Sequence, residues 1–144
     1  MTLYRLFKEL EDSALLEPNV RTIVENDIYR INSLADIDYR IFAITQNQHR
    51  SNEAYMTYSL NLFIVDRWDE TLDNQLNVQS DAIVALKEII DRFMDKHPDF
   101  WFNGTVMYQP FYQRFKDVTA GVYATVEINV PIDQCWSDYE EDGD

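Results

Sequence analysis

The chain contains a single cysteine, Cys135, and only three glycines and four prolines in 144 residues. One cysteine excludes an internal disulfide and a zinc site built from cysteines. No apolar run approaches the roughly 20 residues that span a bilayer. The N-terminus, Met1 to Arg5, lacks the basic and then apolar layout of a secretory signal. These absences predict a soluble, disulfide-free protein made in a reducing cytoplasm, with no membrane partner.

Positive charge is also scarce, because 12 Lys and Arg stand against 26 Asp and Glu, a formal net charge of -14. A nucleic-acid binder needs clustered Lys and Arg to neutralise phosphates, so specific DNA or RNA binding is not expected. The hydrophobic share of 46% is nevertheless that of a folded protein. The length predicts a single domain over residues 1–132, followed by an acidic tail over residues 133–144.

Motifs for catalysis and for ligand binding are missing from the sequence. His49 and His97 have no metal-ligand spacing to each other or to Cys135. The three glycines stand alone and cannot form a phosphate cradle, and neither a Gly-x-Ser-x-Gly elbow nor a His-Glu-x-x-His pair occurs. The acidic stretch 66–74 lacks the glycine of a calcium loop. We therefore expect no enzymatic activity, no cofactor and no metal.

Apolar residues recur at helical spacing in two segments. The first helix is expected to begin after Thr2, a suitable N-cap, and to end before Pro18. The second is expected from about Val78 to Met94. Its predicted buried stripe comprises Ala82, Ile83, Leu86, Ile90 and Phe93.

Alternation of apolar and polar residues predicts the strands. Short elements are expected at 20–24 and 28–31, and strands at 36–45, 55–65, 105–108 and 122–130, with Pro110 breaking the strand at 105–108. The segments 36–45 and 55–65, joined by the polar loop 46–53, predict an antiparallel hairpin. The expected fold is α+β, with a mostly antiparallel sheet and two helices packed on one face.

The strand faces turned away from the predicted core are unusually free of charge. In 55–65 this face carries Tyr, Thr, Ser, Asn, Phe and Val, and 122–130 adds Tyr123, Thr125 and Asn129 around Glu127. Uncharged hydrogen-bonding residues with aromatics are typical of protein interfaces. The alternative is that loops of the same chain cover this face.

Aromatic residues are abundant, at 14% of the chain, and residues 100–115 hold seven in sixteen positions. A domain of this size would bury about half of them and expose the rest as a binding patch. The full set of predicted subunit or partner contacts is His49, Arg50, Thr57, Ser59, Asn61, Trp68, Trp101, Tyr108, Phe111, Tyr112, Tyr123, Trp136 and Tyr139.

The layout from residue 1 to about 132 resembles small neck or tail-completion proteins of tailed bacteriophages, of the tail-terminator and connector-ring type found in crAss-like phages. The segments that carry the resemblance are the N-terminal helix, Val20 to Asp27, Phe63-Ile64-Val65-Asp66, Thr71…Asn74…Val78, and Arg114-Phe115-Lys116-Asp117…Ala120-Gly121-Val122.

The resemblance implies a structural protein without catalytic residues. Such proteins form closed rings, six- or twelve-fold, between the portal and the tail, so self-association and contact with the portal and adjacent neck or tail rings are expected. The sheet would line or join the ring, and loop 46–53 would reach a neighbouring ring. DNA would pass through without specific binding, because a negative lumen repels phosphates. The expected location is the virion, after assembly in the host cytoplasm.

Two other classes of function remain open. An acidic DNA-mimic inhibitor of a host defence protein would need acids spaced like phosphates on one exposed face. A small-molecule-binding α+β domain would use the aromatic stretch 100–115 as its pocket.

Overall fold

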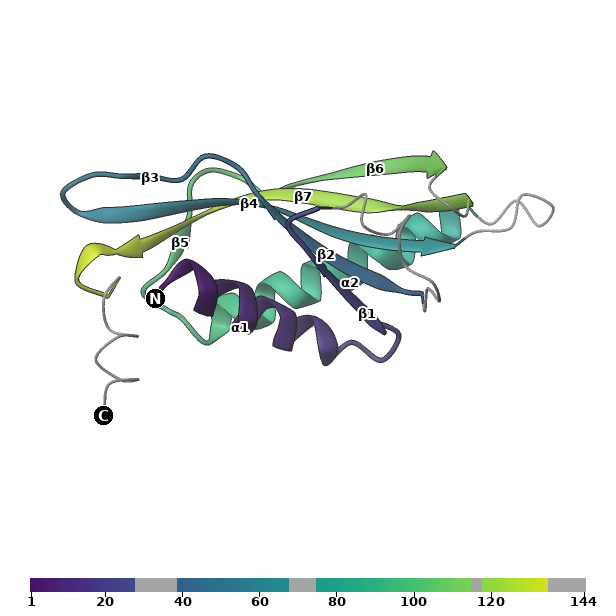
Figure 1. Cartoon of the computed structure of the whole chain (residues 1–144), viewed down its shortest axis with the longest axis horizontal. Coiled ribbons are helices and arrows are strands. Elements are labelled where there is room, and N and C mark those ends of the chain that lie inside the picture. The colour runs from purple at the N-terminus through teal and green to yellow at the C-terminus, as the bar shows by residue number, and fades with distance from the viewer. Residues whose placement is uncertain (28–38, 68–74, 115–117, 135–144) are drawn as a thin grey trace.

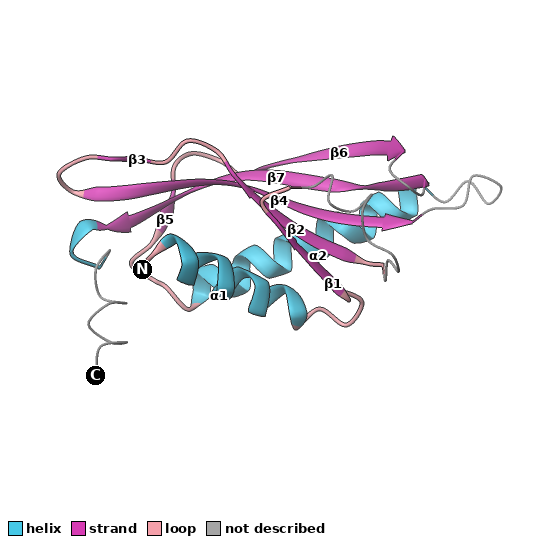
Figure 2. Cartoon of the chain, in the orientation of Figure 1, coloured by secondary structure: helices cyan, strands magenta, loops and turns pink. Residues whose placement is uncertain are grey.

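The computed structural model describes residues 1–27, 39–67, 75–114 and 118–134. In these residues seven strands form one sheet, and two helices lie against one of its faces (Figure 1). The predicted α+β fold, with a mostly antiparallel sheet and both helices on one face, is confirmed (Figure 2). The expected element at 28–31 and residues 135–144 of the expected acidic tail lie outside the described residues.

Helix α1 (Leu3–Leu15) begins as predicted at Thr2, whose hydroxyl accepts a hydrogen bond from the Arg5 amide at 3.2 Å. This cap satisfies one of the amides that have no partner within the first turn of a helix. The helix ends before Pro18, with Leu16 as its C-cap. It buries the side chains of Leu6, Phe7, Leu10 and Ala14.

Helix α2 (Gln75–Asp95) begins earlier than the expected Val78. Its buried stripe is slightly rotated around the helix axis relative to the predicted stripe. Ala85 and Ile89 join the buried residues, whereas Ile83 is 38% exposed, so its place in the predicted stripe was wrong. At 100° per residue, Ile83 falls on the margin of a stripe centred near Leu86 and Ile89. Arg92 reaches α1 and donates to the Ser13 carbonyl at 2.6 Å.

The two longest strands, β4 (Tyr55–Arg67) and β7 (Val118–Pro131), pair antiparallel along the whole length of β4. On its other side β4 pairs antiparallel with β2 (Ile41–Gln46), as the predicted hairpin requires. The predicted loop 46–53 contains a further short strand, β3 (Arg50–Ser51), which also pairs with β4. Strand β1 (Thr22–Glu25) runs parallel to β2 at the sheet edge.

Strands β5 (Trp101–Phe102) and β6 (Met107–Arg114) both pair with β7. The sequence predicted a strand broken by Pro110, but β6 continues through it. Proline is tolerated because β6 has a ladder partner on one side in the described chain, and an edge strand can present the missing N–H outward. A 3₁₀ turn, η2 (Ile132–Gln134), follows β7.

The main core lies between the helices and the sheet, and the predicted alternation of β4 and β7 supplies it. Alternate residues of β4 and β7 face the helices, among them Leu60, Leu62 and Val126, each at most 1% exposed. We call this the inner face of the sheet and its opposite the outer face. A smaller apolar cluster, Val24, Ile41, Ala43 and Val65, is buried on the outer face.

Candidate functional site

Strand register assigns most predicted contact residues to one face, because successive residues of a strand point to opposite sides. Those on the outer face are Arg50, Thr57, Ser59, Asn61, Trp101, Phe111 and Tyr123. Tyr108 and Tyr112 pair with Ala124 and Ala120 and so lie on the inner face. Trp68, Trp136 and Tyr139 lie outside the described residues.

Arg50 and Glu127 form a two-pronged ion pair on the outer face. Both guanidinium nitrogens donate to the carboxylate at 3.0 Å, and Asn103 adds a third hydrogen bond at 2.9 Å. These bonds, that from Arg50 first, lower the pKa of Glu127, so it is ionised at neutral pH. The pair joins β3 to β7 across β4 and cancels the charge of both side chains.

Asn61 is the centre of an uncharged hydrogen-bond network on the same face. Its amide nitrogen donates to Asn47 Oδ1 at 2.9 Å and to Thr45 Oγ1 at 3.4 Å. Its carbonyl oxygen accepts from the Thr125 hydroxyl at 2.7 Å. The network spans three strands, so these polar groups are held in a fixed arrangement.

Thr57 and Ser59 offer a partner little surface. Thr57 is 1% exposed, and its hydroxyl donates to Asn129 Oδ1 at 2.5 Å. Ser59 is 5% exposed, and its hydroxyl accepts from Asn47 at 3.4 Å. Both residues stabilise the packing of β4 against its neighbours from within the sheet.

His49 has both ring nitrogens engaged inside the chain. Nδ1 accepts from the Ser59 amide at 3.1 Å, which places the proton on Nε2, 3.0 Å from Gln46 Oε1. Burial lowers its pKa, and its ring meets Tyr58 edge-on at 5.6 Å. The residue thus fixes the β2–β3 connection against β4.

The aromatic stretch 100–115 divides between core and surface. Phe100 is buried and Phe102 packs against the main core, whereas Trp101 is 44% and Tyr112 43% exposed. Trp101 meets Tyr55 edge-on, with ring centres 5.2 Å apart. Phe111 lies beside Phe63 and Tyr123 over the buried outer cluster. The small cluster is thus shielded by aromatic side chains of the strands β4, β6 and β7 themselves, whereas the alternative interpretation expected loops over this face.

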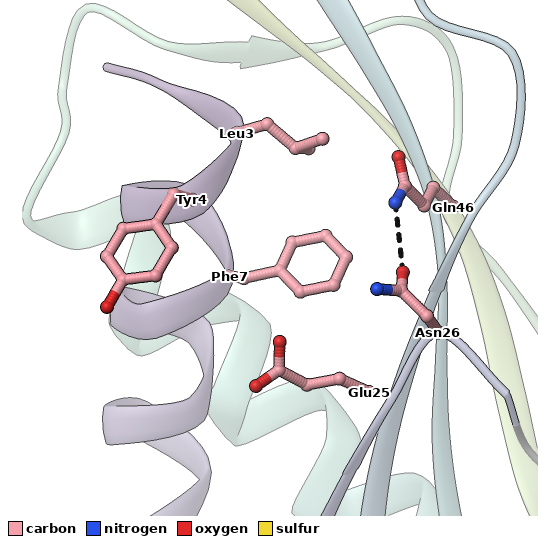
Figure 3. Close-up of a pocket in the computed structure, with 6 residues that line it drawn as sticks. All are labelled: Leu3, Tyr4, Phe7, Glu25, Asn26 and Gln46. Carbon is pink, nitrogen blue, oxygen red and sulfur yellow. Dashed lines mark hydrogen bonds between the residues drawn. The ribbon is translucent and has the colours of Figure 1, made fainter.

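A pocket of about 200 Å³ opens elsewhere, between the start of α1 and the strands β1 and β2 (Figure 3). Leu3 and Phe7 extend from α1 towards Asn26 and Gln46, whose side chains share a 2.9 Å hydrogen bond. Tyr4 and Glu25 complete its lining. Of the stretch 100–115, none of the residues that the structure describes lines it, so it is a different pocket from the one the sequence suggested.

The described ranges contain neither a cluster of metal-binding side chains nor a helix that could span a membrane. Within them, no three His, Cys, Asp or Glu side chains gather as a metal site would need. The described helices include none long and apolar enough to cross a membrane.

Sequence reasoning found the outer face but missed residues that organise it. Asn47, Asn103 and Glu127 were not among the predicted contacts, although all three hold the polar groups of this face in place. Their roles depend on cross-strand register, and the sequence of the loop 46–53 does not reveal which of its residues pair with β4. The one available signal was Glu127, the single acid on an uncharged strand face. No family model matches this chain, and no curated protein matches its sequence.

Proposed function

We propose that this chain is a structural virion protein that forms a homo-oligomeric ring in the neck or tail terminus of a tailed bacteriophage. In this role it contacts copies of itself, the portal and adjacent ring proteins, and it carries out no catalysis. The resemblance in layout supports the virion assignment, and the surface of the sheet supports assembly.

The observation that carries the proposal is the polar half of the outer face. Between Tyr55 and Asn61 of β4, and on the residues paired with them, the charged strand side chains are Arg50 and Glu127, which neutralise each other. A solvated face in a protein with 26 acids would carry several of them. A neutral, hydrogen-bonding face with Trp101 and Met107 exposed beside it fits a protein partner.

The distribution of charge suits a ring around DNA. The excess of acids keeps a passing duplex from adhering, since like charge repels phosphates over about a Debye length. The acids of α1 and α2 are interleaved with cations, as in Lys8–Glu11 and Lys87–Asp91. That interleaving favours the ring over a DNA mimic, which needs an unbroken row of acids.

Mass spectrometry of purified virions, with copy number per particle, tests the proposal. We expect the chain in the virion at a multiple of six copies. Affinity purification of the tagged chain from infected cells provides the comparison. Recovery of portal and neck proteins supports the ring, whereas a host nuclease as the main partner, with the chain absent from virions, would establish the mimic instead.

A further inference from the structure

The pocket between the start of α1 and the strands β1 and β2 has the size of a single side chain (Figure 3). Its volume of about 200 Å³ is below the roughly 300 Å³ at which pockets for small molecules and cofactors begin. It exceeds the roughly 150 Å³ of an engineered cavity that holds benzene. Leu3 and Phe7 supply apolar surface. A side chain with a narrow apolar stem therefore fits the pocket.

A series of hydrogen bonds fixes which atom Asn26 turns towards this pocket. The backbone amide of Ser59 can only donate, and it donates to His49 Nδ1 at 3.1 Å, so the ring proton lies on Nε2. Nε2 then donates to Gln46 Oε1 at 3.0 Å, and Gln46 Nε2 donates to Asn26 Oδ1 at 2.9 Å. Asn26 Nδ2 is left as a donor, and Figure 3 shows it turned towards α1. This wall of the pocket therefore suits a hydrogen-bond acceptor.

The backbone of Asn26 is also held in an unusual conformation. Its φ of 68° is positive, which is uncommon for a residue other than glycine. Its amide donates to the Ile44 carbonyl at 2.7 Å, which anchors the end of β1 to β2. The donor of the side chain is thus presented from a fixed position.

A second side of the pocket carries negative charge in excess. Glu25 extends from β1 towards α1 (Figure 3), and it shares Lys8 with Glu11, at 2.9 Å and 3.4 Å. Glu11 is 7% exposed, and its Oε2 has no hydrogen-bond partner in the described chain. Burial, and then Glu25, raise the pKa of Glu11 to about 6, so this carboxyl is still mostly ionised at pH 7.5. Two carboxylates against one ammonium group attract a further cation.

We infer that this pocket is a docking site for an arginine side chain of a basic partner protein. The apolar stem of the arginine lies along Leu3 and Phe7. Its guanidinium pairs with Glu25, and a backbone carbonyl of the same segment accepts from Asn26 Nδ2. Arginine is favoured over lysine because its planar head donates two bonds to one carboxylate, and because it is enriched at protein interfaces. The inference goes beyond the proposed ring, since it names the chemistry of a partner rather than a contact between subunits.

Charge selects a basic protein as the source of this side chain. The chain carries -14, so a basic surface is attracted to it, whereas a second copy brings the same charge and no complement. Among the described residues that line the pocket, Glu25 is charged and no Lys or Arg is present. Phosphates and acidic peptides are repelled by the same carboxylates.

Saturation-transfer NMR tests the pocket, because it observes the ligand and works for an oligomer of any size. The probe is N-acetyl-arginine N-methylamide, which has the stem, the guanidinium and the carbonyl groups of a residue within a chain. The citrulline derivative is the matched probe, since it has nearly the same shape and no charge. The arginine probe should bind about ten-fold more tightly. Equal affinities of the two probes would overturn the proposal.

Glu25→Gln removes the negative charge and keeps the approximate shape of the side chain. It should weaken binding of the arginine probe about ten-fold and leave the citrulline probe unchanged. Glu53→Gln is the matched control, because Glu53 is exposed between β3 and β4 and the change in net charge is the same. It should affect neither probe. Equal losses in the two variants would show a general attraction to an acidic protein and would overturn a specific pocket.

Asn26→Gly tests the hydrogen-bond donor separately. Glycine adopts the positive φ of this position without strain, so the fold should be kept, and circular dichroism checks all three variants. Both probes carry the carbonyl groups, so both should bind about three-fold more weakly. An unchanged affinity would overturn the part assigned to Asn26. Tighter binding of free arginine than of the capped probe would overturn a protein as the source of the side chain.

Discussion

At the scale of single residues, Gly121 shows how closely β4 and β7 approach each other. A Cβ built on Gly121 would lie 1.9 Å from the Ile64 carbonyl oxygen, on the neighbouring strand. Backbone atoms of a central strand cannot move aside as a flexible side chain can. Glycine is therefore required here for space, as is common where two backbones come close within a sheet.

Gly121→Ala should lower the free energy of unfolding by about 3 kcal/mol, because the new methyl group forces β4 and β7 apart. Urea denaturation measures the loss. Gly104→Ala is the control, since its φ of 86° strains an alanine but nothing lies within 4 Å of the new Cβ. It should cost about 1–2 kcal/mol. Equal losses in both variants would contradict the close approach.

Glu11 is a second residue whose surroundings differ from what its sequence position suggests. It lies on α1 but is only 7% exposed. Burial, and then the nearby Glu25, raise its pKa to about 6, and Lys8 at 3.4 Å offsets part of this effect. The folded state therefore binds a proton more tightly than the unfolded chain does. Its contribution to stability is greatest below pH 4.5 and is lost as the pH rises through 6.

Glu11→Gln should accordingly stabilise the protein by about 1–2 kcal/mol at pH 8 and have little effect at pH 4. Thermal unfolding across this pH range measures the difference. Asp12→Asn, an exposed acid on the same helix, should change stability little at either pH. A benefit of Glu11→Gln that is largest at low pH would show that the sign of the pKa shift is wrong.

At the scale of elements, the packing of α1 depends on polar contacts with α2 as well as on apolar burial. Arg92 donates to the Ser13 carbonyl at 2.6 Å and to Glu17 at 3.3 Å. The Ser13 hydroxyl donates to the Ile89 carbonyl at 2.9 Å. The bond from Arg92 gives a charged donor to the Ser13 carbonyl in the last turn of α1, which also accepts from the Leu16 amide at 3.2 Å.

Arg92→Met keeps most of the side-chain volume but removes the bonds from Arg92 to Ser13 and Glu17. It should cost about 2 kcal/mol, because the Ser13 carbonyl and the buried Glu17 lose a charged donor. Chemical denaturation gives the value. Lys87→Met, on the exposed side of the same helix, is the matched control and should leave stability almost unchanged. If the two variants lost similar amounts of unfolding free energy, the contact between α1 and α2 would depend on apolar packing alone.

At the scale of the whole molecule, the net charge of -14 opposes both folding and assembly. Repulsion among like charges acts against a compact state and is screened by salt. At neutral pH the unfolding temperature and the degree of self-association should both rise with NaCl. As the pH approaches the isoelectric point of about 4.3, the salt effect on the unfolding temperature should fade. A salt effect of equal size at both pH values would indicate a cause other than net charge.

The sequence could predict much of this fold because its signals are local. The period of α1, its Thr2 cap, and the alternation of β4 and β7 act within a few residues, and each was identified correctly. Ile83 and Pro110 were misplaced because their environments depend on which neighbours lie beside them. A helix margin and a sheet edge exist only after the layers have packed.

The candidate surfaces divide in the same way. Sequence by itself determined that the outer strand face would be nearly free of charge, since alternation fixes which side chains share a face. Tertiary structure decided that Thr57 is buried, that Arg50 neutralises Glu127, and that a pocket opens between α1 and the strands β1 and β2. These facts depend on register and on helix placement, which set contacts between residues far apart in the chain, and no local pattern encodes those distances.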